Sequence, residues 1–137
     1  MKKTLVVLRI LIGVLFLAAG WTKIINPEWT AAGFLGTAKT FPALYSWFAS
    51  SANIAWVDFL NQWGLAAIGL SMITGLLVRP AAVGGMLMMA LYYFPGVELP
   101  YVVEDHIIYI AVFALLYAEN AGKYFGLDHF IFSAKAK

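Results

Sequence analysis

Long apolar runs separated by short polar breaks make up most of the chain. A bilayer core about 30 Å thick requires roughly 20 apolar residues in a helix, and the runs at about 5–25 and 57–78 meet that length. A shorter run at 80–94 stops before Pro95, and a fourth covers 101–118. The pattern predicts an all-α bundle of four transmembrane helices, with the third span the shortest.

The connection between the first two spans, residues 26–56, is too long to be structureless in a compact domain. Asn26, Pro27 and Glu28 offer a cap, a first-turn proline and an acid, which together predict a helix start. Pro42 predicts the start of a second short helix. The segment is rich in aromatic side chains, which favour the membrane interface. We expect short interfacial helices on the outer leaflet.

Positive charges gather on one side of the predicted spans. With four spans, this side holds Lys2, Lys3, Arg79, Lys123, Lys135 and Lys137, whereas the other side holds Lys23, Lys39 and most of the acids. Arg79-Pro80 also predicts a tight hairpin between the second and third spans. The positive-inside rule then places both termini, including the tail at 119–137, in the cytoplasm. We therefore expect a single multi-pass domain in the cytoplasmic membrane, in which the charges of the inner end set the orientation.

The first apolar run also resembles a secretory signal, with two lysines, an apolar core and small residues at Ala18, Ala19 and Gly20. Arg9 inside the run is unusual for a signal core, so we expect a spanning helix instead. The Arg9 side chain would either extend to the headgroups or pair with Glu119 at the same end.

Composition restricts the chemistry that the chain can perform. Of 137 residues, 63% are hydrophobic and 12% are charged, against about a quarter charged in soluble domains. The net charge of +2 is too small to indicate nucleic-acid binding, and the absence of cysteine excludes thiol relays and cysteine-held iron–sulfur or zinc sites. His106 and His129 are predicted at opposite ends of the last span, so we expect no haem site within one chain.

Polar side chains recur near the outer ends of the predicted spans. They are Lys23 in the first span, Asp58, Asn61 and Gln62 in the second, and Glu104, Asp105 and His106 in the fourth. Ionisable groups in spans usually face the bundle interior or a cavity. We predict a polar pocket near the outer leaflet, with the aromatic segment 26–56 as its wall. The alternative is that these groups lie in the headgroup layer.

Four short motifs, in their order and spacing, resemble the DoxX family. They are Arg9–Gly13 leading to Gly20-Trp21-Thr22-Lys23, then Gly75–Pro80, Asp105-His106 and Ala121–Asp128. The resemblance covers nearly the whole chain and implies a four-helix membrane protein. Members of the family include the membrane subunit of thiosulfate:quinone oxidoreductase and proteins of membrane-associated oxidoreductase complexes. The resemblance therefore raises quinone-linked redox chemistry.

A quinone site requires hydrogen-bond donors at the quinone carbonyls, proton sources and apolar or aromatic walls. The candidate catalytic residues are Asp105, His106 and Lys23, and the candidate quinone-binding residues are Lys23, His106, Tyr109, Trp21 and Gln62. On this reading the chain is the membrane subunit of a quinone-linked oxidoreductase that receives electrons from a partner subunit, a bound cofactor or the reductant. The alternatives are a non-catalytic anchor for a soluble redox protein and a small-molecule carrier. Glycine-lined helix faces would also suit a homo-oligomer.

Overall fold

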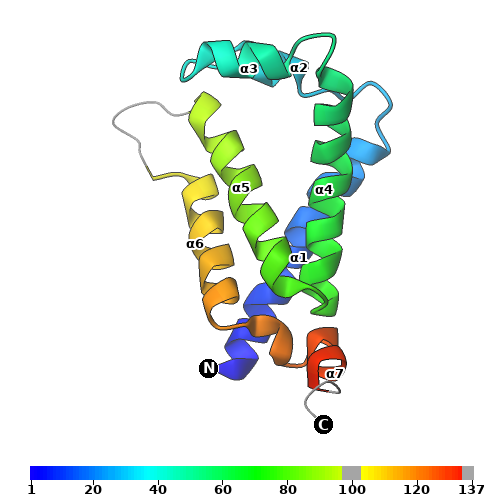
Figure 1. The fold of residues 1–137 in the computed structure, drawn as a ribbon, viewed down its shortest axis with the longest axis vertical. Coiled ribbons are helices and arrows are strands. Elements are labelled where there is room, and N and C mark those ends of the chain that lie inside the picture. The colour runs from blue at the N-terminus through cyan, green and yellow to red at the C-terminus, as the bar shows by residue number, and fades with distance from the viewer. Residues whose placement is uncertain (97–102, 134–137) are drawn as a thin grey trace.

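The computed structural model of the chain describes residues 1–96 and 103–133, which contain helices and no strand (Figure 1). In chain order the elements are α1 (Lys2–Ile24), α2 (Ala32–Gly36), α3 (Pro42–Phe48), α4 (Ile54–Thr74), α5 (Val78–Gly96), α6 (Asp105–Ala118), the 3₁₀ turn η1 (Ala121–Lys123) and α7 (Leu127–Ser133). The all-α prediction is confirmed. The four longest helices, α1, α4, α5 and α6, fall on the four predicted spans.

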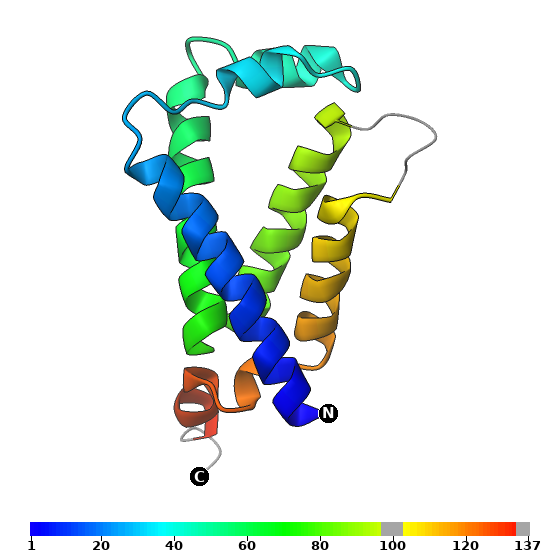
Figure 2. The same ribbon diagram turned by 180° about the vertical axis from the view of Figure 1, so that it is seen from behind.

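These four helices pack as two pairs. α1 lies along α4, α5 lies along α6, and the two pairs are joined through α4 and α5. Figures 1 and 2 show α4 and α5 meeting near α7 and diverging toward the opposite end, across which α2 and α3 lie. The start of α1 and α7 share one end of the bundle, hereafter the α7 end. The other end is called the α2–α3 end.

Glycine allows α1 and α4 to approach until their backbones touch. A Cβ atom on Gly69 would lie 2.3 Å from the backbone nitrogen of Leu17, and one on Gly20 would lie 2.5 Å from the backbone nitrogen of Ala66. Such distances leave no room for a side chain, as is typical of close helix pairs in membranes. Glycine therefore permits the close contact of this helix pair.

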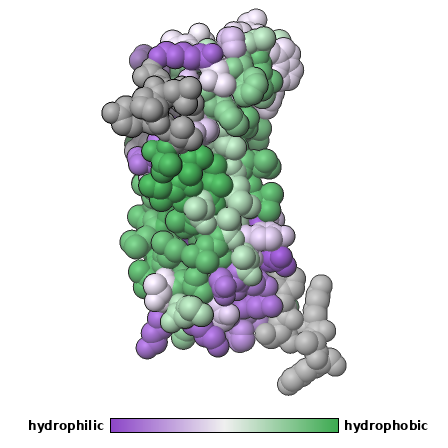
Figure 3. Space-filling model, turned by 90° about the vertical axis from the view of Figure 1, so that its left-hand side faces the viewer, coloured by the Kyte–Doolittle hydropathy of each residue, from purple (hydrophilic) through white to green (hydrophobic). Residues whose placement is uncertain are grey.

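Among the described residues, α1 alone is both long and apolar enough to cross a bilayer, and α6 is apolar but has 14 residues. α4 and α5 have 21 and 19 residues. Their sequences include polar groups such as Asn61 and Gln62 in α4 and Arg79 in α5, which lower the mean hydropathy. Four long helices are thus confirmed, but four spans and their orientation are not. Figure 3 shows an apolar band on one face of the molecule, between two more hydrophilic ends.

Two predicted helix boundaries need correction. α5 continues through Pro95 to Gly96, so the third helix is not the shortest of the four. α6 begins at Asp105 rather than at 101, and the predicted start at 101–102 lies outside the described residues. As a result, α6 is the shortest of the four long helices.

The connection between α1 and α4 contains two short helices, as predicted, but only the second begins where the sequence places it. Asn26 does not cap a helix; its side-chain oxygen accepts a hydrogen bond from the Glu28 N–H at 3.2 Å, which forms a turn. The helix that follows, α2, begins only at Ala32. Pro42 is the first residue of α3, preceded by Phe41 in the left-handed conformation, so the second prediction is confirmed.

Arg9 is the largest fully buried side chain, with 1% of its surface exposed. Its guanidinium donates hydrogen bonds to the carbonyl oxygens of Ala121 at 2.8 Å, Tyr124 at 3.0 Å and Phe125 at 3.3 Å. The side chain therefore neither extends to the headgroups nor pairs with Glu119, which is exposed. It joins the first third of α1 to the segment that follows α6.

Asp128 continues this connection into the α4–α5 hairpin. One carboxylate oxygen accepts from the Leu77 N–H at 2.8 Å, and the other accepts from the Val78 N–H at 3.1 Å, at the start of α5. The Asp128 N–H donates to the Gly75 carbonyl at 2.9 Å. The hairpin predicted at this turn is confirmed, with Gly75 at φ 70° closing α4. Arg9 and Asp128 thus hold the α7 end together.

Candidate functional site

Tyr92 on α5, a residue that the sequence did not single out, connects the polar groups of the α2–α3 end. Lys23 Nζ donates a hydrogen bond to the Tyr92 hydroxyl at 3.0 Å, and this hydroxyl donates in turn to the side-chain oxygen of Asn61. The His106 ring lies beside the Tyr92 ring, with 5.9 Å between ring centroids. Each of the four long helices thus contributes one residue to this group, which we call the Tyr92 cluster.

Lys23 is held in the cluster by uncharged groups. Besides its bond to Tyr92, its ammonium lies 4.7 Å from the centroid of the Trp29 ring, within the range of a cation–π interaction. Across residues 1–96 and 103–133, no carboxylate forms an ion pair with Lys23. An ammonium without a counter-ion polarises the Tyr92 O–H and makes it a stronger hydrogen-bond donor.

The predicted residues of α6 do not all reach the cluster. His106 is half-buried, and its Nδ1 lies 2.7 Å from a carboxylate oxygen of Glu104. Asp105 is exposed in the first turn of α6. Tyr109 packs edge-on against Phe16 of α1, at 6.1 Å between centroids. His106 is therefore the residue of this set that contacts Tyr92, whereas Asp105 and Tyr109 face other surroundings.

Trp21 and Gln62 are also separate from the cluster. Trp21 is 57% exposed and borders a surface groove with Val14, Leu17 and Ala18 on the outside of α1. Gln62 takes part in the α1–α4 contact through its backbone. Its carbonyl oxygen packs so close to Gly20 that a Cβ atom on Gly20 would lie 2.8 Å from it. Of the five predicted quinone-binding residues, the structure brings Lys23 and His106 together around Tyr92.

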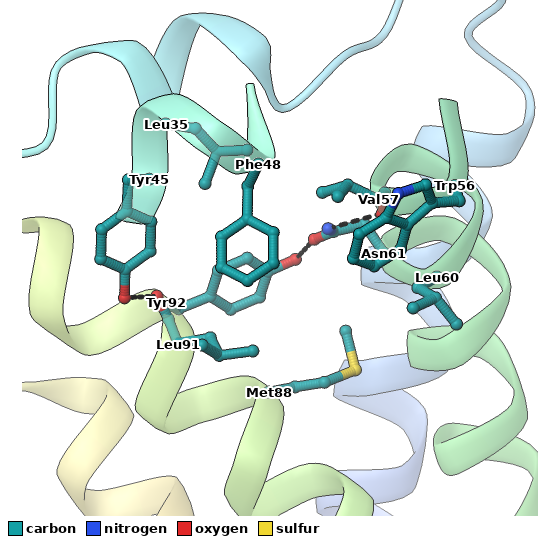
Figure 4. A pocket seen from close by; sticks show the side chains of 10 residues that line it. All are labelled: Leu35, Tyr45, Phe48, Trp56, Val57, Leu60, Asn61, Met88, Leu91 and Tyr92. Atoms are coloured by element: carbon teal, nitrogen blue, oxygen red, sulfur yellow. Dashed lines mark hydrogen bonds between the residues drawn. The ribbon is translucent and has the colours of Figure 1, made fainter. Parts of the chain in front are cut away.

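A cavity of about 120 Å³ lies beside the Tyr92 cluster, enclosed by α4, α5 and the segment 26–56 (Figure 4). Its lining residues are Leu35, Tyr45, Phe48, Trp56, Val57, Leu60, Asn61, Met88, Leu91 and Tyr92. Most of this lining is apolar or aromatic, and Figure 4 shows Phe48 above the Tyr92 ring. The polar groups at the wall are Asn61 and the two tyrosine hydroxyls. An apolar cavity of about 150 Å³ accommodates benzene, so this one is of the size of a single ring.

Two hydrogen bonds fasten the segment 26–56 over the cavity. The Tyr45 hydroxyl donates to the Leu91 carbonyl at 2.8 Å, and burial raises the pKa of the Tyr45 hydroxyl. At the other side, an Asp58 carboxylate oxygen accepts from the Ala31 N–H at 2.8 Å, next to the start of α2. The segment 26–56 does line this cavity, through Leu35, Tyr45, Phe48 and Trp56, but the cavity is mainly apolar, whereas the sequence predicted a polar pocket.

Sequence reasoning did not find the centre of the site because Tyr92 gives only a weak local signal. It lies in a run of apolar and aromatic residues near the end of α5, where tyrosine commonly marks the membrane interface. Its partners are 69 and 31 residues away in the chain. The sequence indicates Asn61 as one of several polar residues at the start of the second span, but it does not indicate which residue Asn61 contacts.

Comparison with known proteins assigns the chain to one family. The family model for DoxX matches residues 4–95, which include α1 to α4 and nearly all of α5. The matched region contains Arg9 and three members of the Tyr92 cluster, whereas α6 and the segment that binds Arg9 follow it. Searches of curated proteins and of solved structures give no significant match. Because the match covers well over half of the chain, the protein belongs to the DoxX family, a family of membrane proteins.

Proposed function

We propose that this chain is the membrane subunit of a quinone-linked oxidoreductase and binds the ring of a quinone in the cavity beside Tyr92. In this proposal the four long helices cross the cytoplasmic membrane with both termini in the cytoplasm. The cavity then opens near the outer leaflet, as the distribution of lysine and arginine favours. The observation that carries the proposal is the Lys23–Tyr92–Asn61 hydrogen-bond chain at the wall of a ring-sized apolar cavity.

The cavity offers what a quinone ring requires. Phe48, Trp56 and Met88 supply flat or adaptable apolar walls. Asn61 donates one amide hydrogen to the Val57 carbonyl at 2.9 Å, and an asparagine amide has a second hydrogen to donate. The Tyr92 hydroxyl has a single hydrogen, which the Asn61 side-chain oxygen accepts. A bound quinone carbonyl would replace Asn61 as the acceptor of this hydrogen, and the Lys23 ammonium would strengthen the bond. These groups can hold the carbonyl oxygens of a quinone.

A bound quinone would supply the redox couple, and the residues of the chain would supply binding and protons. The ammonium of Lys23 holds a proton next to the Tyr92 hydroxyl, and the ring of His106, which pairs with Glu104, lies 5.9 Å from the Tyr92 ring between centroids. The chain has no thiol to pass electrons. We therefore assign electron delivery to a redox partner subunit or to a soluble reductant.

The test is binding of ubiquinone-1, a short-chain quinone, to the purified protein in detergent. Tyr92→Phe removes one hydroxyl and keeps the ring, so we expect the dissociation constant to rise about ten-fold, the value of roughly one hydrogen bond. Lys23→Met should weaken binding by a similar factor because it removes the charge that polarises Tyr92. Equilibrium dialysis followed by chromatography measures the bound quinone.

Tyr109→Phe is the matched control, since it makes the same chemical change on a tyrosine that does not line the cavity. We expect it to bind ubiquinone-1 as the original protein does. Equal affinity of the Tyr92 and Tyr109 variants, together with no quinone retained by the purified protein, would contradict the proposal. The chain would then be better described as a non-catalytic anchor for a redox partner.

A further inference from the structure

A second cavity, of about 290 Å³, lies at the α7 end, far along the bundle from Tyr92. Its lining residues are Leu77, Arg79, Pro80, Asn120, Lys123 and Asp128. They come from the α4–α5 hairpin, from η1 and its preceding turn, and from α7. The cavity therefore forms where the segment after α6 folds back onto the hairpin.

The side chains that line this cavity carry a net positive charge. The Asp128 carboxylate is buried, and its two oxygens accept the Leu77 and Val78 N–H groups. Its charge is also opposed by the nearby Arg9 guanidinium. Arg79 and Lys123 are exposed at the rim, and neither forms an ion pair within the part of the chain that the structure describes. Two positive charges thus remain without an anion.

The fold positions both cations at the rim, Arg79 through a side-chain contact and Lys123 through the backbone of η1. The Arg79 guanidinium stacks on the Tyr117 ring of α6, 4.3 Å from its centroid. Lys123 is the last residue of η1, which follows the turn made by Asn120 at φ 49°, and both residues line the cavity. A stacked guanidinium loses less freedom when it binds an oxyanion. The rim thus resembles a prepared anion site.

We propose that this cavity binds the phosphate group of an anionic phospholipid. Arg79 and Lys123 would bind the phosphate oxygens, the Asn120 amide would bond to the headgroup, and Leu77 and Pro80 would contact the glycerol and upper acyl carbons. Basic pockets at the inner ends of membrane helices recognise lipid headgroups in this manner. The exposed apolar surface of Leu77, 53% accessible, adjoins the charged rim and suits a lipid better than a free anion. This proposal does not depend on quinone binding.

The experiment counts phosphatidylglycerol molecules bound to the purified protein in detergent by native mass spectrometry, with zwitterionic phosphatidylcholine, which has no net charge, as the comparison. Each phosphate-facing cation near the membrane adds roughly five-fold in affinity. We therefore expect Lys123→Gln to weaken phosphatidylglycerol binding about five-fold, and Arg79→Gln with Lys123→Gln to weaken it about twenty-fold. Phosphatidylcholine binding should weaken less, because its choline ammonium offsets the charge of its phosphate.

The control is Lys2→Gln with Lys3→Gln, which removes the same charge at the same end but from residues outside the cavity lining. We expect this variant to keep most of its preference for phosphatidylglycerol. An equal loss in the control would show that diffuse charge is responsible and would overturn the site. Displacement of the lipid by millimolar inorganic phosphate would instead assign the cavity to a free anion. The Lys123→Gln variant keeps the test decisive if the double variant is poorly folded, since Lys123 is exposed.

Discussion

Replacing Arg9 by methionine is expected to lower the free energy of unfolding by about 3–5 kcal/mol, the usual cost of removing one partner from a buried charged network. Methionine retains much of the side-chain volume but donates no hydrogen bond. Three carbonyl oxygens in 121–125 would then lose their donor, and the buried Asp128 carboxylate would lose the opposing charge. Unfolding by sodium dodecyl sulfate in mixed micelles measures the loss, and hydrogen exchange should rise in 119–128.

Lys3→Met is the matched control, because Lys3 lies in the first turns of the same helix but is exposed. We expect it to change stability by less than about 0.5 kcal/mol, as is usual for surface substitutions. A double-mutant cycle with Asp128→Asn adds a second check. Residues of one network are not additive, so the double variant should lose less stability than the sum of the two single variants. Strict additivity would contradict a shared network.

Gly69→Ala is expected to destabilise the protein by about 1–3 kcal/mol, the range for overpacking of a close contact. The new methyl group would lie 2.3 Å from the Leu17 nitrogen and 2.7 Å from the Gly13 carbonyl oxygen. Both are backbone atoms of α1, so the helix pair must separate to make room. The midpoint temperature of thermal unfolding in detergent provides the measurement.

Gly64→Ala on the same helix is the control for that experiment. Its methyl group would lie 3.4 Å from the flexible Met88 sulfur, which is an ordinary contact. Alanine is a better helix former than glycine by about 1 kcal/mol, so this variant should be as stable as the original or more so. If Gly69→Ala were equally stable, the close approach of α1 and α4 would not be needed for the fold.

The elements that could be predicted from sequence depend on local signals. Apolar runs of helical length locate the four long helices, and prolines locate two of the starts, near Pro42 and Pro80. Predictions that relied on one residue type alone were less accurate. Pro95 does not end α5 before it, and Asn26 makes a turn rather than a cap. A proline in the last turn of a helix has no N–H to donate to the carbonyl four residues earlier, and packing can offset the loss of this one hydrogen bond.

Only part of the candidate site could be predicted, because sequence patterns report local signals and not contacts between distant residues. A lysine and a histidine near the ends of apolar helices are unusual enough to suggest a polar interior, and Lys23 and His106 do meet at Tyr92. Trp21 and Asp105 gave equally strong signals but are exposed. Which face of a helix turns inward depends on how the helices cross, and in apolar helices such as these the hydrophobic pattern differs little between faces.

By itself, the sequence determined that this is a helical membrane-type chain with four long helices, a tight hairpin and an aromatic connection, because each of these follows from neighbouring residues. The tertiary structure alone decided which polar groups are partners. Arg9 reaches carbonyls 112 to 116 residues away, and Lys23 reaches a hydroxyl 69 residues away. Buried polar groups must find hydrogen-bond partners, but the helix crossing selects them. The Tyr92 cluster and the Arg9–Asp128 network therefore appear only when the chain is folded.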